Sequence, residues 1–281
     1  MKNPLNLLNR SLWNAKPRFR IDAEDQAALE QPGTLLLAME RDRLLRYLPS
    51  GGKIAEIGVA RGAFSAQLSD VCKPSYLALV DPWHEQDTKI YYSDSNNAAQ
   101  TEQDRRYQNV AQRFASDQPG RECKVLRKYS AEATKEFRDQ FFDWVFIDGN
   151  HSYDACLEDL RLWAPKVQAD GLICGHDFAV HSSARQARYG VVEAVQTFVS
   201  ETGFGLAALT VEHFPTFVIA KDMSGATLRR MRQLIFSSEA HVIQLQGWDG
   251  QGLDHARLLD TGRPRSAFMS FHAGGSRKSA Q

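Results

Sequence analysis

The sequence predicts an α/β protein in which a mostly parallel β-sheet is covered by helices on both faces. Two observations support this prediction. Short apolar segments bounded by Gly, Pro or Asp are mostly followed by longer segments with helical periodicity, and repeated strand–helix units form parallel sheets. The last two apolar segments are separated only by residues 212–215, which is too short for a parallel crossover, so we expect them to form an antiparallel hairpin.

The expected elements can be assigned in chain order. The strands are Lys53–Ile57, Tyr76–Val80, Cys123–Leu126, Trp144–Ile147, Leu172–Gly175, Leu206–Val211 and Thr216–Ala220. The helices between them are Gly62–Leu68, Thr101–Phe114, Ala131–Phe137, Tyr153–Trp163 and Val191–Val199. Ahead of the first strand, Leu35–Leu48 spaces its apolar residues at roughly helical intervals, and Thr34 could serve as its N-cap, so we expect a helix here as well.

The composition divides the chain into four parts. Residues 1–32 form a basic N-terminal arm without the continuous apolar region of a secretory signal, and residues 33–221 hold the predicted α/β domain. Residues 222–260 form an appendage with an expected helix at Ala226–Phe236 and an extra strand in His241–Leu245. Residues 261–281 are rich in Gly, Ser, Arg and Ala and have few large apolar side chains, which predicts a disordered tail.

The overall composition excludes several classes of protein. Lys and Arg together number 34, as do Asp and Glu, so no excess of positive charge favours nucleic acid or anionic lipid. The longest apolar runs fall far short of the roughly 20 residues that a membrane helix needs. The four cysteines show no metal-site spacing and are expected to be reduced thiols. We expect a cytoplasmic protein with no membrane partner.

A glycine-containing loop follows the first strand. Glu56, Gly58 and Gly62 form the pattern Glu-x-Gly-x-x-x-Gly, in which the glycines allow backbone amides to approach a ligand. The dinucleotide fingerprint would need glycine at positions 60 and 63, where this chain has alanine, and the pattern of a phosphate-binding loop is absent. An acid beside the loop suits a cofactor that carries positive charge. Asp81, at the end of the second strand, is placed to accept hydrogen bonds from both hydroxyls of a ribose.

Two Asp–His pairs follow the fourth and fifth strands. Asp148 and His151 follow the fourth strand, and His176 and Asp177 follow the fifth. Neighbouring parallel strands lie about 4.8 Å apart, so the two carboxylates should emerge side by side and could hold a hard divalent cation. Either imidazole could accept a proton from a substrate hydroxyl. Alternatively, Asp148 could cap the following helix, Asp177 could simply end its strand, and either histidine could be structural.

These residues resemble the class I S-adenosylmethionine-dependent methyltransferases, and most closely a subgroup with Ile-Asp-Gly-x-His-x-Tyr and Gly-His-Asp motifs, over about residues 33–221. The resemblance implies a Rossmann-like three-layer sandwich with a seven-stranded, mostly parallel sheet in the order 3-2-1-4-5-7-6 and an antiparallel strand 7. It also implies roles for individual residues. Glu56, Gly58 and Gly62 would support the methionine end of the cofactor, Asp81 its ribose and Ser130 the border of its adenine.

The resemblance also covers the Asp–His pairs after the fourth and fifth strands. Asp148 matches an acid at the cofactor site, and Asp148 and Asp177 match positions that bind magnesium in some related O-methyltransferases. Trp83 could pack beside adenine or fill the core. The loop lacks a third glycine, and His176-Asp177 differs from the metal ligands of the better-known enzymes, which leaves the metal open.

The expected function is methyl transfer from S-adenosylmethionine to the oxygen of a small hydroxylated metabolite. Asp148 and Asp177 would place the acceptor through Mg²⁺ or another divalent cation, and His151 or His176 would receive the proton. The alternatives are a non-catalytic cofactor-binding module and a nicotinamide-dependent oxidoreductase. Nucleic acid is disfavoured as the acceptor because no Asn-Pro-Pro-Tyr type sequence is present. The identity of the acceptor and the formation of a homo-oligomer remain open.

Overall fold

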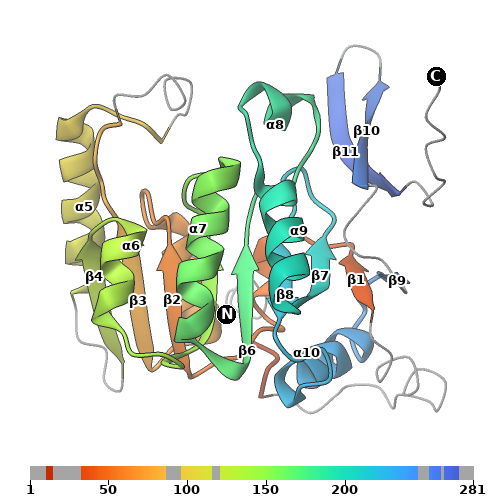
Figure 1. Cartoon of the computed structure of the whole chain (residues 1–281), viewed down its shortest axis with the longest axis horizontal. Helices are drawn as coiled ribbons and strands as arrows, with labels where there is room; N and C mark the ends of the chain where they lie inside the picture. The colour runs from red at the N-terminus through yellow and green to blue at the C-terminus, as the bar shows by residue number, and fades with distance from the viewer. Residues whose placement is uncertain are drawn as a thin grey trace, which may run out of the picture.

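The computed structural model describes residues 11–14, 33–86, 96–115, 121–245, 253–260 and 263–271. Its main feature is a nine-stranded sheet in the order β4-β3-β2-β5-β6-β8-β7-β1-β9 (Figure 1). The strands are β1 Thr34–Leu37, β2 Lys53–Ile57, β3 Tyr76–Asp81, β4 Glu122–Arg127, β5 Phe142–Ile147, β6 Val167–Gly175, β7 Gly205–Thr210, β8 Phe217–Ala220 and β9 Val242–Leu245.

Within this sheet, the seven predicted strands are adjacent to one another and follow the predicted order. In chain order they are β2 to β8, and their spatial order β4-β3-β2-β5-β6-β8-β7 corresponds to 3-2-1-4-5-7-6. β8 pairs antiparallel with both β6 and β7, whereas β2, β3, β4, β5 and β6 pair in parallel. The mostly parallel α/β sheet and its antiparallel strand are therefore confirmed, although the strand count is nine rather than seven.

The predicted helix at Leu35–Leu48 is wrong. Residues Thr34–Leu37 form strand β1, which pairs in parallel with β7 and antiparallel with β9, and only Arg41–Leu44 is helical (α3). The leucines of β1 alternate between the two cores of the protein, as a central strand requires. The Thr34 hydroxyl donates to the Leu206 carbonyl at 2.7 Å and caps no helix. A short, fully apolar run has the same periodicity in a buried strand as in a buried helix, which is why its spacing misled the prediction.

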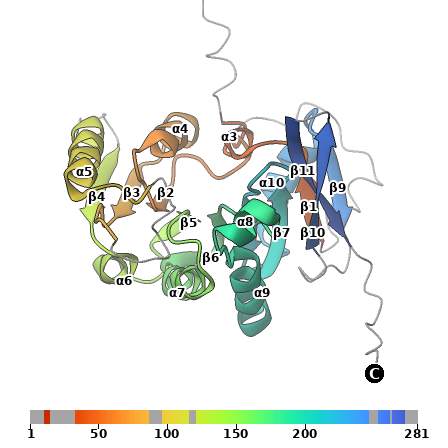
Figure 2. The ribbon, with the colours of Figure 1, turned by 90° about the horizontal axis from the view of Figure 1, so that it is seen from above.

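Helices cover both faces of the sheet (Figure 2). On one face lie α4 (Ala63–Cys72), α5 (Gln100–Phe114) and α10 (Ala226–Phe236), and on the other lie α6 (Ser130–Ala133), α7 (Tyr153–Trp163) and α9 (Val191–Thr202). Side chains of β5 alternate between the two cores: Trp144 and Phe146 point to the first, and Val145 and Ile147 to the second. This alternation explains why consecutive residues of β5 are apolar.

The C-terminal part contains one further correction. The expected extra strand is present as β9, but Arg263–Phe271 in the predicted disordered tail forms strand β11, which pairs antiparallel with β10 (Leu253–Asp260). Two strands close together in the sequence can pair through their backbone groups alone. The low apolar content of the tail therefore did not exclude a hairpin. Residues 272–281 lie outside the described residues, as does most of the N-terminal arm. The described helices include none that could span a membrane.

Candidate active site

A cavity of about 690 Å³ opens at the carboxyl edge of the sheet, where the loops after β2 to β6 meet. Ligands of open α/β sheets bind at this edge. Eight of the predicted site residues line the cavity, namely Glu56, Gly58, Asp81, Ser130, Asp148, His151, His176 and Asp177. Two others, Gly62 and Trp83, are not among the lining residues.

The glycine loop lies against the loop that follows β5. Gly58 has a φ of +91°, and a Cβ at this position would lie 1.9 Å from the carbonyl oxygen of Asp148, so no larger residue fits. Gly62 begins α4 with a left-handed φ of +70°. These two constraints place the turn between strand and helix directly under the cavity.

Asp81 organises this loop from the end of β3. Its Oδ2 accepts hydrogen bonds from the backbone amides of Val59 at 3.0 Å and Ala60 at 2.9 Å, and its Oδ1 accepts from Trp83 N at 2.7 Å. Burial raises the pKa of Asp81, and these three amides oppose that rise. A carboxylate has about four acceptor positions, so Asp81 can hold the loop and still face a ribose hydroxyl in the cavity.

Trp83 fills the core, which was one of its two predicted placements. Its side chain is fully buried, its Nε1 donates to the Ala60 carbonyl at 2.8 Å, and its ring packs 5.2 Å from that of Tyr107. It thus supports the glycine loop from beneath. It is not among the residues that line the cavity.

Glu56 is a buried acid that faces the cavity from β2. It is 1% exposed, and burial raises its pKa to about 8. Its Oε2 has no hydrogen-bond partner among the described residues. A buried carboxylate oxygen without a donor is costly unless a ligand supplies one, and a positively charged group would satisfy it. The site therefore fits a cofactor with an ammonium or sulfonium group on this side.

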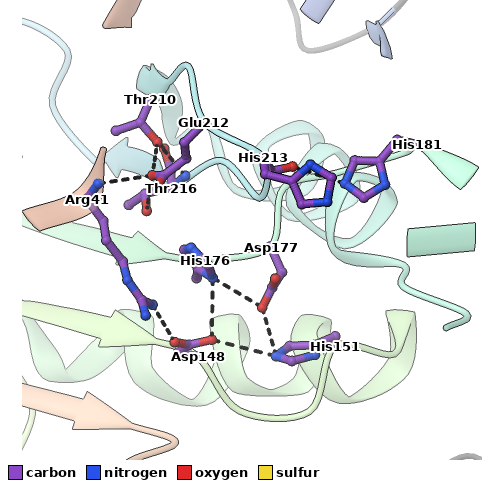
Figure 3. Close-up of polar contacts among 10 residues, drawn as sticks. All are labelled: Arg41, Asp148, His151, His176, Asp177, His181, Thr210, Glu212, His213 and Thr216. Carbon is purple, nitrogen blue, oxygen red and sulfur yellow. Dashed lines mark hydrogen bonds and ion pairs between the residues drawn. The ribbon is translucent and has the colours of Figure 1, made fainter. Parts of the chain in front are cut away.

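The two Asp–His pairs come together as predicted (Figure 3). His151 Nε2 lies 2.9 Å from Asp177 Oδ2 and 3.6 Å from Asp148 Oδ1. His176 Nδ1 lies 3.3 Å from Asp177 Oδ2 and 3.9 Å from Asp148 Oδ1. Asp177 has a left-handed φ of +62°, a strained conformation for a residue with a side chain, and such strain is concentrated at functional sites.

The charges in this cluster depend on one another. Burial disfavours a charged His151, but the carboxylates of Asp148 and Asp177 outweigh it and raise the pKa of His151 to about 10. Burial would likewise raise the pKa of Asp177, but the imidazoles of His151 and His176 bring it below its ordinary value. An imidazole that keeps its proton at neutral pH is poorly suited to accept one. In this state, the predicted role of His151 as a general base is disfavoured.

Arg41 belongs to the site and was missed by the sequence analysis. Its Nη1 lies 3.0 Å from Asp148 Oδ2, its guanidinium lies 4.6 Å from the ring centroid of Phe64, and its backbone amide donates to Glu212 Oε1 at 3.1 Å. Figure 3 shows Arg41 reaching from the segment after β1 toward Asp148. No motif marks this residue. Arg41 reaches the cavity because the residues before it form strand β1 of the sheet. The helix predicted for these residues would not have placed it there.

Ser130 is positioned by the fold at the start of α6. Its Oγ accepts a hydrogen bond from Trp163 Nε1 at 2.8 Å, and it lines the cavity close to Lys128 and Tyr129, which follow β4. Its role at the border of the adenine stays a prediction. Ser130 is separated along the sheet edge from the Asp–His cluster after β5 and β6.

Comparison with known proteins identifies a family that part of this chain matches. Residues 55–178, from β2 to just beyond β6, match the model of a methyltransferase domain family. Comparison with curated proteins gave no match.

Solved structures with a similar arrangement share little sequence with this chain. The N-methyltransferase NodS from Bradyrhizobium japonicum is 13% identical, with a TM-score of 0.45 over 71% of this chain and 98% of that one. A putative type 11 methyltransferase from Sulfolobus solfataricus is 14% identical, with a TM-score of 0.40 over 60% and 83%. The tRNA methyltransferase TrmK of B. subtilis is 12% identical, with a TM-score of 0.41 over 64% of each chain.

The sheet order, the glycine loop and the family match agree with one another. Each supports methyl transfer over the nicotinamide-dependent alternative, whose glycine fingerprint is missing from the loop. Residues 55–178 therefore match a methyltransferase domain, and the sheet around them has the strand order expected of class I S-adenosylmethionine-dependent methyltransferases.

Proposed function

We propose that this methyltransferase acts on the oxygen of a small hydroxylated acceptor and that Asp148, His151 and Asp177 hold a divalent cation beside it. One observation carries the proposal. A carboxylate oxygen from each aspartate and a ring nitrogen of His151 lie within 4.8 Å of one another at the wall of the cavity. The two aspartates were predicted as ligands from the sequence, and His151 is added as a third donor, which would release the proton of its Nε2 when the cation binds.

The ion pair between His151 and Asp177 also fits a shared ligand. The Nε2 atom of His151 is buried and lies 2.9 Å from Asp177 Oδ2, a distance that the proton on the imidazole makes favourable. A divalent cation would take the place of that proton, and the same atoms would become its ligands. A set of two oxygens and one nitrogen suits Mn²⁺ or Zn²⁺ as well as or better than Mg²⁺, which prefers oxygen alone.

The residues of the chain have distinct parts in the proposed reaction. Glu56 holds the positively charged end of the methyl donor, and the loop from Gly58 to Gly62 and Asp81 hold the nucleoside, so that donor and acceptor meet at the Asp–His cluster. Such positioning supplies most of the rate of an in-line displacement. A divalent cation in the cluster supplies polarisation of the acceptor hydroxyl. With His151 engaged, His176 is the imidazole left to accept the proton.

The test separates metal binding from cofactor binding. Calorimetry with Mn²⁺ and with S-adenosylhomocysteine is run on the wild type, on Asp177→Asn and on the control Asp139→Asn, an exposed acid paired with Lys166 just before β5. We expect Asp177→Asn to weaken Mn²⁺ binding by about 10-fold or more while S-adenosylhomocysteine binds within about 3-fold of wild type. The control should change neither. Unchanged Mn²⁺ affinity in Asp177→Asn would refute the metal site.

Activity on the acceptor is measured separately. Production of S-adenosylhomocysteine is followed with a panel of small phenols and aliphatic alcohols, with and without a chelator, and the matched amines and thiols serve as controls. Methyl transfer to a hydroxyl that stops on chelation supports the proposal. Transfer to the amines or thiols alone would overturn the assignment to oxygen.

A further inference from the structure

A buried histidine caps a short helix in the connection between β6 and α9. His181 is 3% exposed and directly precedes α8 (Ser182–Gln186), which Figure 1 shows beyond the end of β6. The Nδ1 atom of His181 accepts a hydrogen bond from the backbone amide of Ala184 at 3.3 Å. A helix of five residues is too short to be stable by itself, so its cap and its packing hold it in place.

The two ring nitrogens of His181 have partners of opposite kind. Nε2 lies 3.0 Å from the carbonyl oxygen of His213, which can only accept a hydrogen bond, whereas the Ala184 amide at Nδ1 can only donate one. The capped ring is therefore neutral and has its proton on Nε2. A second proton, on Nδ1, would face the amide proton of Ala184, and the cap would be lost.

The groups around His181 favour the neutral ring as well. His213, from the turn between β7 and β8, is exposed and stacks on His181 with the ring centroids 4.4 Å apart (Figure 3). Two stacked imidazoles repel each other when both are charged. Asp177 pairs with both histidines of the Asp–His cluster, and Glu212 accepts from two threonine hydroxyls. The arginines of the segment are exposed, namely Arg185 and Arg188.

The same segment forms part of the cavity wall. Tyr189 lines the cavity, and its ring centroid lies 4.5 Å from that of His151. The ring of Phe214 lies 5.7 Å from that of Tyr189 and 4.8 Å from that of His181, so it connects the capping residue with the wall. The amide of Gly190 donates to the His151 carbonyl at 2.8 Å. A displacement of α8 would therefore reach the cavity beside the Asp–His cluster.

The backbone directly before Tyr189 is strained. Arg188 has a left-handed φ of +57°, which is unfavourable for a residue with a side chain and persists only while the surrounding contacts hold it. We propose that His181 is a pH-dependent latch: its second proton breaks the cap of α8, and residues 182–190 then separate from the rest of the site and open the wall at Tyr189. This latch does not depend on the identity of the acceptor or on a metal.

The size of the effect follows from the number of protons bound. A free imidazole titrates near pH 6.5, so His181 released from the cap binds a proton below about this pH, and the capped ring does not. His213 is exposed and can take up its own proton in either form. The open form thus binds one more proton, so the closed form dominates at high pH and is lost as the pH falls. From pH 7.5 to pH 5.5, opening should become about 10-fold more favourable.

Amide hydrogen exchange on the full chain tests the latch. Exchange at pH 5.5 and 7.5, corrected for the intrinsic effect of pH, is followed by mass spectrometry in the wild type, in His181→Asn and in the control His241→Asn. Asparagine caps helices but does not titrate, and His241 is an exposed histidine before β9. We expect residues 184–190 to lose about 10-fold in protection at pH 5.5 in the wild type and the control, and less than about 2-fold in His181→Asn. Strand β5 should stay protected in all three.

Each other outcome contradicts the latch. An equal loss of protection in His181→Asn would show that another group titrates, and this result would overturn the inference. A loss in β5 as large as that in residues 184–190 would show global unfolding in acid and would overturn it too. Protection of residues 184–190 in the wild type that does not change with pH would overturn it even where His181→Asn fails to fold.

Discussion

Replacing Glu56 with glutamine should stabilise the ligand-free protein at alkaline pH while weakening cofactor binding. Glu56 is 1% exposed and its pKa is raised to about 8 from an ordinary value of 4.5, mainly by burial. At 1.36 kcal/mol for each pK unit, keeping this side chain ionised costs up to about 5 kcal/mol above pH 8. Glutamine removes the charge but keeps a buried polar group, so we expect a gain of about 1–3 kcal/mol in the free energy of unfolding.

The dependence on pH follows from the direction of the pKa change. Between about pH 4.5 and pH 8, the unfolded chain has lost the proton of Glu56 and the folded chain keeps it. The contribution of this residue to stability is therefore complete below pH 4.5 and is lost as the pH rises through 8. The variant has no proton to lose at this position. The difference in stability between variant and wild type should accordingly grow from pH 5 to pH 9.

Two measurements check this prediction. Urea unfolding at pH 5, 7 and 9 gives the difference in stability. Calorimetry with S-adenosylhomocysteine at pH 7 gives the affinity, which should fall by about 10-fold because glutamine, unlike Glu56, cannot ionise when a positively charged group binds beside it. Glu201→Gln, at an exposed ion pair with Arg161, is the control and should change neither value appreciably. The reasoning is refuted if Glu56→Gln is less stable than the wild type at pH 9 or binds S-adenosylhomocysteine equally well.

Three further substitutions test other parts of the site. Gly58→Ala should destabilise the protein by more than about 3 kcal/mol in urea unfolding, because its Cβ would collide with the Asp148 carbonyl, whereas Gly51→Ala, with a similar φ but open space, should cost only about 1 kcal/mol. Asp81→Asn should weaken S-adenosylhomocysteine binding by about 30-fold in calorimetry, since an amide cannot accept from three loop amides with both of its atoms. Arg41→Met should strengthen Mn²⁺ binding by about 3- to 10-fold, because it removes the positive charge paired with Asp148, and equal or weaker binding would contradict this role.

The strands and helices that were predicted correctly have local sequence patterns that fit only one kind of secondary structure. Each strand from β2 to β6 is a short apolar run followed by a helical segment, and the loop of residues 212–215 allowed only a hairpin between β7 and β8. β1 has no such pattern, since its leucines suit a buried helix or a buried strand equally. Its identity is decided by pairing with β7, which lies more than 160 residues later in the chain.

The residues of the candidate site also fall into those that the sequence predicted and those that only the structure brought together. The sequence by itself determined that Asp148 and Asp177 would meet, because acids at the ends of neighbouring parallel strands share one edge of the sheet. Only the tertiary structure decided that Arg41 reaches Asp148 and that the indole of Trp163 donates to the Ser130 hydroxyl at the wall of the cavity. These contacts join segments whose separation in the chain shows no period or motif. Their positions are set by how β1 and α7 pack against the rest of the fold.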